Sequence, residues 1–395
     1  MIKKINKVGN ERILLIVLFL MSFSMGIWGN YRQLWLKDRL FTVTEISRIF
    51  SVALICSAVI SFIISLFSSK IKIKNVILES IFLRMIAMIV LFFTKDVFII
   101  KIGILLTIMC EVIFLVSYYP LLSYINSSDE MYRKKSLIDY VAKDMGIIGC
   151  GILLGISIHN IPLLTYQGCL VIALITNVLS GIVLLFFKFK EKLSKEHGAL
   201  IKSFKTIIKD KTNIIYLIGV IFIEISYGII FDLIMLILTG KEYINFEVST
   251  ASIFIIVCNF LGSVFCSIFN KLSSKMSFNL SIFIKFGTRL ISFIVAYITN
   301  DINAFIISIV ISFITCRLLE EKSTGTFLRR IKNKDQFLFG NIKYFVACIG
   351  EGIGAFLAGV LIVTSFKNLF LGAAISTTIQ IILIVIAYKT IKDWQ

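Results

Sequence analysis

The sequence predicts an all-α integral membrane protein with twelve transmembrane helices, arranged as two pseudo-symmetric six-helix bundles. Three observations predict this class: the composition, the number of long apolar segments, and a basic stretch near the middle of the chain. Of the 395 residues, 58% are hydrophobic and only 16% are charged, whereas soluble domains are about 45–50% apolar and about 25% charged. A chain with so little polar surface cannot cover a globule in water, so it is expected to lie in a membrane.

Twelve apolar segments are long enough to cross a bilayer as helices, which takes about 20 residues. They are continuous rather than strand-periodic, which argues against a barrel of short strands. In chain order they cover residues 12–36, 45–68, 75–94, 97–125, 138–158, 165–187, 213–238, 247–269, 278–299, 303–320, 336–362 and 368–388. The first follows a basic N-terminus but no cleavage site follows it, so it is expected to remain as a span.

A basic linker at 188–212 separates a first bundle at 1–187 from a second at 213–395. The linker holds eight lysines and three acidic residues. Within it, apolar residues recur at helical spacing opposite lysines, which indicates an amphipathic helix on the membrane surface. A disordered tether is the alternative. The apolar residues are Leu200, Ile201, Phe204, Ile207 and Ile208.

The distribution of basic residues predicts the orientation of the chain. Of 41 Lys and Arg residues, 27 fall in the termini, the linker and the loops of one side, six fall in the loops of the other side, and eight lie within the spans. Because basic loops stay inside, both termini and the linker are expected to be cytoplasmic. The net charge of +18 is then an orientation signal, and we expect no nucleic-acid partner. Abundant Ile, Lys and Asn favour an AT-rich bacterium and its cytoplasmic membrane.

The two halves carry signs of a parallel repeat. An offset of 202 residues aligns Cys56 with Cys258, and it also aligns Ser65 with Ser267 and Phe67 with Phe269. The fifth and eleventh spans both gather glycines, which predicts close helix packing. These glycines are Gly146, Gly149, Gly151 and Gly155 in the fifth span and Gly350, Gly352 and Gly354 in the eleventh. Parallel six-span halves are typical of transporters with a site between the halves.

The architecture resembles the major facilitator superfamily. Six plus six spans, cytoplasmic termini and a long basic central loop carry the resemblance, and the glycines from Gly146 to Gly155 are similar to the family's fifth-helix motif without its proline. The family's loop motif G-x-x-x-D-R-x-G-R-[KR]-[KR] keeps only its basic character at 65–74, where Ser69 takes the acidic position. The resemblance implies transport by alternating access, with spans one, four, seven and ten lining the central cavity.

Ionisable side chains at mid-membrane cost at least about 2.5–3.5 kcal/mol, so they usually face a cavity or a partner. The candidates for substrate binding or proton coupling are Glu224, Glu111, Asp232, Arg32, Arg317, Glu351, Asn30 and Tyr227. Glu224 and Asp232 are eight residues apart, roughly 80° around a helix, and share a broad face. Our hypothesis is that Glu224 or Glu111 carries a proton, since burial favours the neutral carboxyl. The alternative is a structural ion pair, for example between Glu111 and Arg84.

Two arginines, Arg84 and Arg289, fall at matching depths on spans three and nine. The resemblance implies that these spans lie toward the periphery. We therefore favour structural pairing with neighbouring helices for both, and an anion-binding role is the alternative.

Together these features predict a secondary active transporter of a small organic or amphipathic solute, with proton-coupled efflux as one mode. The partners expected are the substrate, protons and the lipid bilayer, with the chain acting as a monomer. We expect no metal, since no C-x-x-C occurs and both histidines lie in loops, and no cofactor or enzymatic role. The alternatives are a lipid or glycolipid flippase on the same fold and a polytopic membrane enzyme.

Overall fold

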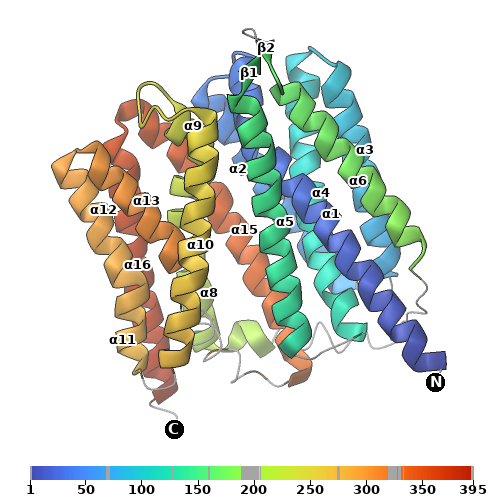
Figure 1. The fold of residues 1–395 in the computed structure, drawn as a ribbon. Coiled ribbons are helices and arrows are strands. Elements are labelled where there is room, and N and C mark those ends of the chain that lie inside the picture. Colours follow the sequence, from blue (N-terminus) through green and yellow to red (C-terminus); the bar gives the residue numbers. More distant parts are fainter. Residues whose placement is uncertain are drawn as a thin grey trace. The chain divides into compact units, whose positions relative to one another are not determined.

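The chain folds into long helices that follow the expected apolar segments (Figure 1). The computed structural model describes residues 2–67, 72–125, 129–158, 161–187, 204, 206–273, 276–318, 327, 331 and 333–392. The first half contains α1 (Ile2–Asp38), α2 (Val43–Phe67), α3 (Ile73–Phe93), α4 (Val97–Ile125), α5 (Asp129–Gly155), β1 (Ser157–Ile158), β2 (Ile161–Pro162) and α6 (Tyr166–Leu185). The second half contains α8 (Lys211–Phe231), α9 (Ile234–Thr239), α10 (Val248–Ser273), α11 (Phe278–Ile282), the π-helical turn η1 (Phe283–Gly287), α12 (Thr288–Thr299), α13 (Ile302–Arg317), α15 (Asn333–Thr364) and α16 (Lys367–Lys392).

The predicted class of all-helical membrane protein is confirmed. Among the described residues, ten helical stretches are long and apolar enough to cross a membrane, and Ile302–Cys316 in α13 is a shorter apolar helix. The remaining expected span, 138–158, coincides with the apolar part of α5, whose first turns are polar. Each of the twelve expected spans therefore coincides with helix.

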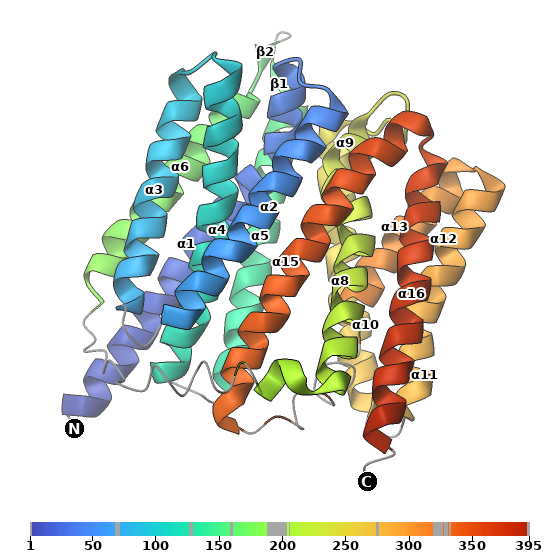
Figure 2. The same ribbon diagram turned by 180° about the vertical axis from the view of Figure 1, so that it is seen from behind.

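The helices pack in two compact units that share one internal plan. Unit 1 comprises Met1–Thr42, Val59–Glu196 and Glu247–Ile253, and unit 2 comprises Val43–Ala58, His197–Phe246 and Phe254–Gln395. Within unit 1, α1 lies against α5 and α6, and α3 lies against α4 and α6 (Figure 1). Within unit 2, α8 lies against α15 and α16, and α12 lies against α13 and α16 (Figure 2). The same pairings recur in the same order, which confirms the predicted repeat.

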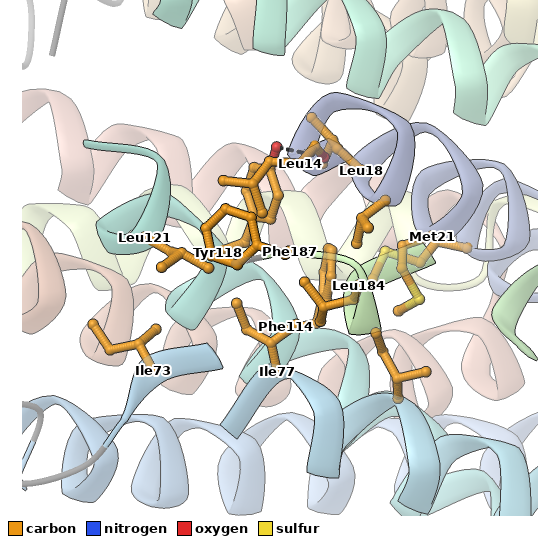
Figure 3. Packing of buried hydrophobic residues seen from close by; sticks show 13 residues of the cluster. Leu14, Leu18, Met21, Ile73, Ile77, Phe114, Tyr118, Leu121, Leu184 and Phe187 are labelled. Carbon is orange, nitrogen blue, oxygen red and sulfur yellow. Dashed lines mark hydrogen bonds between the residues drawn. The ribbon is translucent and has the colours of Figure 1, made fainter. Parts of the chain in front are cut away.

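An apolar cluster fills the end of unit 1 where α3 begins and α4 and α6 end. Figure 3 shows its side chains converging from α1, α3, α4 and the end of α6. Its buried members include Leu14, Leu18, Met21, Ile73, Ile77, Phe114, Tyr118, Leu121, Leu184 and Phe187. The Tyr118 hydroxyl donates to the Leu14 carbonyl oxygen at 2.9 Å, so its polar end is satisfied (Figure 3).

Two of the expected spans are interrupted, although neither contains a proline. The span expected at 213–238 breaks at Asp232 and Leu233, where α8 ends and the backbone of Leu233 leaves helical geometry (φ −115, ψ 18). The span at 278–299 contains η1, in which the hydrogen bonds widen for one turn. Neither interruption contains a proline, so the sequence held no breaking signal for them.

The end of the fifth span also differs from the prediction. The helix α5 ends at Gly155, and β1 pairs with β2 in antiparallel register, with Ser157 opposite Pro162. A span to residue 158 was expected. The backbone groups of this short connection are paired in the hairpin instead of in a last helical turn.

The amphipathic helix predicted in the linker remains a prediction, since residues 188–203 and 205 lie outside the described residues. Residues 206–209 are helical, with Ile207 buried and Lys209 exposed as predicted, whereas Ile208, which was predicted on the apolar face, is exposed.

Glycines mark the crossings of the helices within each unit. A Cβ atom added at Gly146 would lie 2.6 Å from the carbonyl oxygen of Phe23 on α1. In unit 2, one added at Gly354 would lie 2.5 Å from the carbonyl oxygen of Ile225 on α8, and one at Gly350 would meet the carbonyl oxygen of Ile221. These close approaches need a residue without a side chain.

The other predicted glycines divide into two groups. Added Cβ atoms at Gly151 and Gly155 would meet Ser252 and Ser249 at the start of α10, and one at Gly352 would lie 2.9 Å from Ile55 of α2. An added Cβ at Gly149 meets nothing within 4 Å. Helix packing therefore does not require glycine at position 149.

We expect Gly146→Val to destabilise the protein by at least about 1–3 kcal/mol, because the added side chain must push α1 away from α5. Gly149→Val on the same helix is the matched control, since its side chain enters open space. Thermal unfolding in detergent measures both. Equal unfolding midpoints for the two variants would show that the crossing of α1 and α5 is looser than described.

Candidate functional site

A buried arginine lies at the centre of unit 1. Arg84 of α3 is fully buried, and its Nη1 donates to Ser24 Oγ of α1 at 2.7 Å and to Asn177 Oδ1 of α6 at 3.1 Å. Its Nη2 forms an ion pair with Glu111 Oε1 of α4 at 2.9 Å. One guanidinium thereby joins four helices of the unit.

Glu111 is shared between two arginines. Its second oxygen, Oε2, lies 3.0 Å from Nη1 of Arg32 on α1, and the side chains of Arg32 and Glu111 are 14% and 12% exposed. Two guanidinium groups against one carboxylate leave a formal charge of +1 on these three side chains. Glu111 therefore makes charge-assisted hydrogen bonds through both of its oxygens. The ion pair between Glu111 and Arg84, given above as the alternative to proton coupling at Glu111, is present.

Unit 2 gathers carboxylates instead. Glu224 lies on α8, Asp232 at the break that ends α8, and Glu351 on α15, all three half-buried. Tyr344 and Cys348 lie one turn apart on α15, and the charges of Glu224 and Glu351 both act on these two side chains. The charge of Asp232 also acts on Cys348. Three of the predicted acidic candidates are therefore grouped around one tyrosine–cysteine pair.

Close packing of α8 and α15 brings these groups together. A Cβ added at Gly350 would lie only 3.0 Å from Cβ of Glu224. On α15, Tyr344, Cys348 and Glu351 are spaced four and three residues apart, so they share one face of the helix. Tyr344 and Cys348 were missed as candidates, although this helical spacing around Glu351 was visible in the sequence.

Tyr227 connects this group to the buried arginine of unit 2. Nη2 of Arg289 donates to the Tyr227 hydroxyl at 2.5 Å, and Nε of Arg289 donates to Thr315 Oγ1 at 2.9 Å. The guanidinium carbon also lies 4.4 Å from the centroid of the Tyr227 ring, within the range of a cation–π contact. Glu224 lies three residues before Tyr227 on α8, close enough for its charge to act on Tyr227.

The remaining candidates do not join these groups. Asn30 Nδ2 donates to the Gly26 carbonyl oxygen of its own helix at 2.9 Å, a local contact within α1. Arg317 is the last residue of α13, and its side chain lies outside the described residues. Within unit 1 the structure unites Arg32 and Glu111, and within unit 2 it unites Glu224, Glu351, Asp232 and Tyr227.

Comparison with known proteins identifies the fold. No protein-family model matches the chain, and no curated protein matches it in sequence. The chain is similar to the crystal structure of the nucleoside transporter NupG, with a TM-score of 0.69 at 13% identity over 97% of this chain and 99% of that one. It is also similar to a bacterial homologue of the human lysosomal transporter Spinster, with a TM-score of 0.71 at 12% identity over 97% and 95% of the two chains.

A third similar structure is a POT family transporter in complex with 5-aminolevulinic acid, with a TM-score of 0.71 at 15% identity over 96% of each chain. All three are membrane transporters, and each is matched over almost its whole length. The chain therefore has the major facilitator superfamily fold.

Proposed function

We propose that the protein is a secondary active transporter that moves a small organic solute by alternating access, driven by protons that bind at Glu224. The observation that carries the proposal is the position of Glu224, a half-buried carboxylate near the middle of the span Lys211–Thr239, on a helix that breaks eight residues later at Asp232. A carboxylate at this depth is a candidate for carrying a proton. Glu111 in unit 1 is instead held in ion pairs with Arg32 and Arg84.

The acidic grouping supports the choice of Glu224 within unit 2. Two carboxylates close to one another resist being ionised together, so one of them takes up a proton first. Glu224 lies beside Tyr227 and Tyr344 on a helix that breaks at Asp232, which is the kind of discontinuous helix that lines transporter sites. Glu351 is the second member of the pair and shares the coupling in this proposal.

The side chains at the centres of the two units also favour a class of substrate. Charged, hydroxyl and aromatic side chains side by side suit a small organic solute with polar groups, and an amphipathic compound is included in this class. The similar structures are named for nucleoside and peptide-family transporters, which supports a polar organic solute. We propose that the protein acts as a monomer in a bacterial cytoplasmic membrane. Both termini are inside in this proposal, because 27 basic residues lie on one side of the spans and six on the other.

Transport into proteoliposomes tests the proposal. The full-length protein is reconstituted and offered nucleosides, short peptides, amino acids and lipophilic cations, with and without an imposed pH gradient. We expect at least one class to accumulate, or to be expelled, only when the gradient is present. Movement of a labelled lipid between leaflets, with no solute transported, would instead favour a flippase.

A further inference from the structure

Arg289 of unit 2 occupies the place that Arg84 occupies in unit 1. Both are buried, Arg84 on α3 in the third expected span and Arg289 on α12 in the ninth. The helices that surround them also correspond, since α3 lies against α4 and α6 as α12 lies against α13 and α16. Ser24 and Asn177, the neutral partners of Arg84, correspond to Ser226 and Gln380 at offsets of 202 and 203 residues.

The difference between the two sites is the countercharge. Arg84 and Arg289 are 205 residues apart, and the same offset takes Glu111 to Cys316. In the part of the chain that the structure describes, the partners of Arg289 are all neutral, namely the Tyr227 hydroxyl and ring, the Thr315 hydroxyl and the Phe286 ring.

Two buried polar groups on the packed helices α12 and α16 lack hydrogen-bond partners among the described residues. They are Nη1 of Arg289 on α12 and the amide of the fully buried Gln380 on α16, whose oxygen and nitrogen both have no hydrogen bond. In unit 1, Arg84 Nη1 donates to Asn177 and the Asn177 amide donates to the Ile81 carbonyl oxygen, and the buried guanidinium nitrogen of Arg84 without a partner is Nε. A buried guanidinium without a countercharge is strongly unfavourable, and a buried amide without partners adds to that cost.

The backbone around Arg289 is irregular where that around Arg84 is regular. The π-helical turn η1 ends two residues before Arg289, and α8 breaks five residues after Tyr227. By contrast, α3 is a regular α-helix from Ile73 to Phe93. Turns of π-helix inside α-helices are found most often at functional sites, and non-helical backbone at membrane depth is tolerated where it lines a cavity or is buried in protein.

We propose that Arg289 is the centre of an anion site in unit 2, completed by Tyr227, Thr315 and Gln380, which binds one small monovalent anion. The anion supplies the countercharge that Glu111 supplies in unit 1, and it accepts hydrogen bonds from Arg289 Nη1 and the Gln380 amide nitrogen. A carboxylate group of a transported solute and a free halide share this chemistry. If the protein is the transporter proposed above, the carboxylate would belong to its substrate.

The thermal stability of the purified full-length protein tests the site without any transport. Unfolding midpoints are measured against increasing sodium chloride or sodium acetate, with sodium 2-(N-morpholino)ethanesulfonate at equal ionic strength as the bulky reference anion. We expect chloride or acetate to raise the midpoint saturably, as a ligand of the folded state does. Stronger stabilisation by acetate identifies a carboxylate site, and stronger stabilisation by chloride identifies a halide site.

Two variants assign the effect to Arg289. Arg289→Gln is expected to weaken the apparent affinity by at least about tenfold, because a charged hydrogen-bond donor is lost. Cys316→Glu supplies the carboxylate internally, as Glu111 does in unit 1, so it is expected to raise the midpoint without added anion and to abolish the response to anion. Lys241→Gln, at an exposed position of the same unit, should respond like the unsubstituted protein.

The site is refuted if neither small anion stabilises the protein more than the bulky sulfonate does. It is refuted equally if Cys316→Glu folds and keeps the full response to the anion. The unfolding midpoints report anion binding without any transport measurement. The proposed anion site can therefore be refuted while the proposed proton-coupled transport stands, and the reverse also holds.

Discussion

Replacing Glu111 with Gln is expected to be among the most destabilising single substitutions in unit 1. The change removes the carboxylate that lies 3.0 Å from Arg32 and 2.9 Å from Arg84, and leaves a fully buried guanidinium without a countercharge. Removing one partner of a buried ion pair costs about 3–5 kcal/mol. Thermal unfolding in detergent should show a midpoint far below that of the unsubstituted protein.

Two further variants separate the ion pair from a general effect of charge. Glu79→Gln removes an exposed carboxylate from α3 of the same unit and should leave the midpoint nearly unchanged. The double variant Arg84→Met with Glu111→Leu removes both buried charges, so it should be less destabilised than Glu111→Gln alone. If Glu111→Gln lowers the midpoint no more than Glu79→Gln does, Glu111 is not the structural anion of unit 1.

The second large effect expected is the loss of gradient-driven solute accumulation when Glu224 is replaced with Gln. In the proposed mechanism Glu224→Gln keeps the size and polarity of the side chain but cannot exchange a proton. A gradient of one pH unit can sustain a solute concentration ratio of about tenfold per proton, and this ratio should fall to about one in the variant. Exchange of labelled for unlabelled solute needs no net proton movement, so it should continue.

The control for Glu224 is Glu242→Gln, which removes an exposed carboxylate outside the spans of the same unit. It should accumulate solute like the unsubstituted protein. Loss of both accumulation and exchange in Glu224→Gln would point to substrate binding or folding. Retention of gradient-driven accumulation would remove Glu224 from the coupling mechanism.

Much of the fold was predictable because a bilayer imposes simple rules. Backbone groups in lipid must be paired internally, so continuous apolar runs of sufficient length become helices, and all twelve expected runs did. The parallel repeat was visible in the glycines of the fifth and eleventh spans. In the structure, Gly146 lets α5 approach α1 closely, and Gly350 lets α15 approach α8 in the same way. The break at Asp232 and the turn η1 were not predictable, since tertiary packing and not a proline sets them.

The site was only partly predictable for a related reason. Burial depth singled out Glu111, Glu224 and Glu351 because an ionisable group in the membrane needs a partner or a cavity. Depth does not say which partner each carboxylate has: Glu111 lies between Arg32 and Arg84, and Glu224 packs against α15 near Gly350. Those surroundings depend on how α1, α3 and α4, or α8 and α15, face one another, and spacing along one helix does not contain that information.

The proton movement that accompanies transport tests the central claim most directly. A pH-sensitive dye trapped inside proteoliposomes records protons while labelled solute is followed in the same vesicles. The unsubstituted protein and Glu242→Gln should move protons only when solute is present, and Glu224→Gln should exchange solute with no proton signal. Solute-dependent proton movement of undiminished size in Glu224→Gln would contradict the assignment of coupling to this carboxylate.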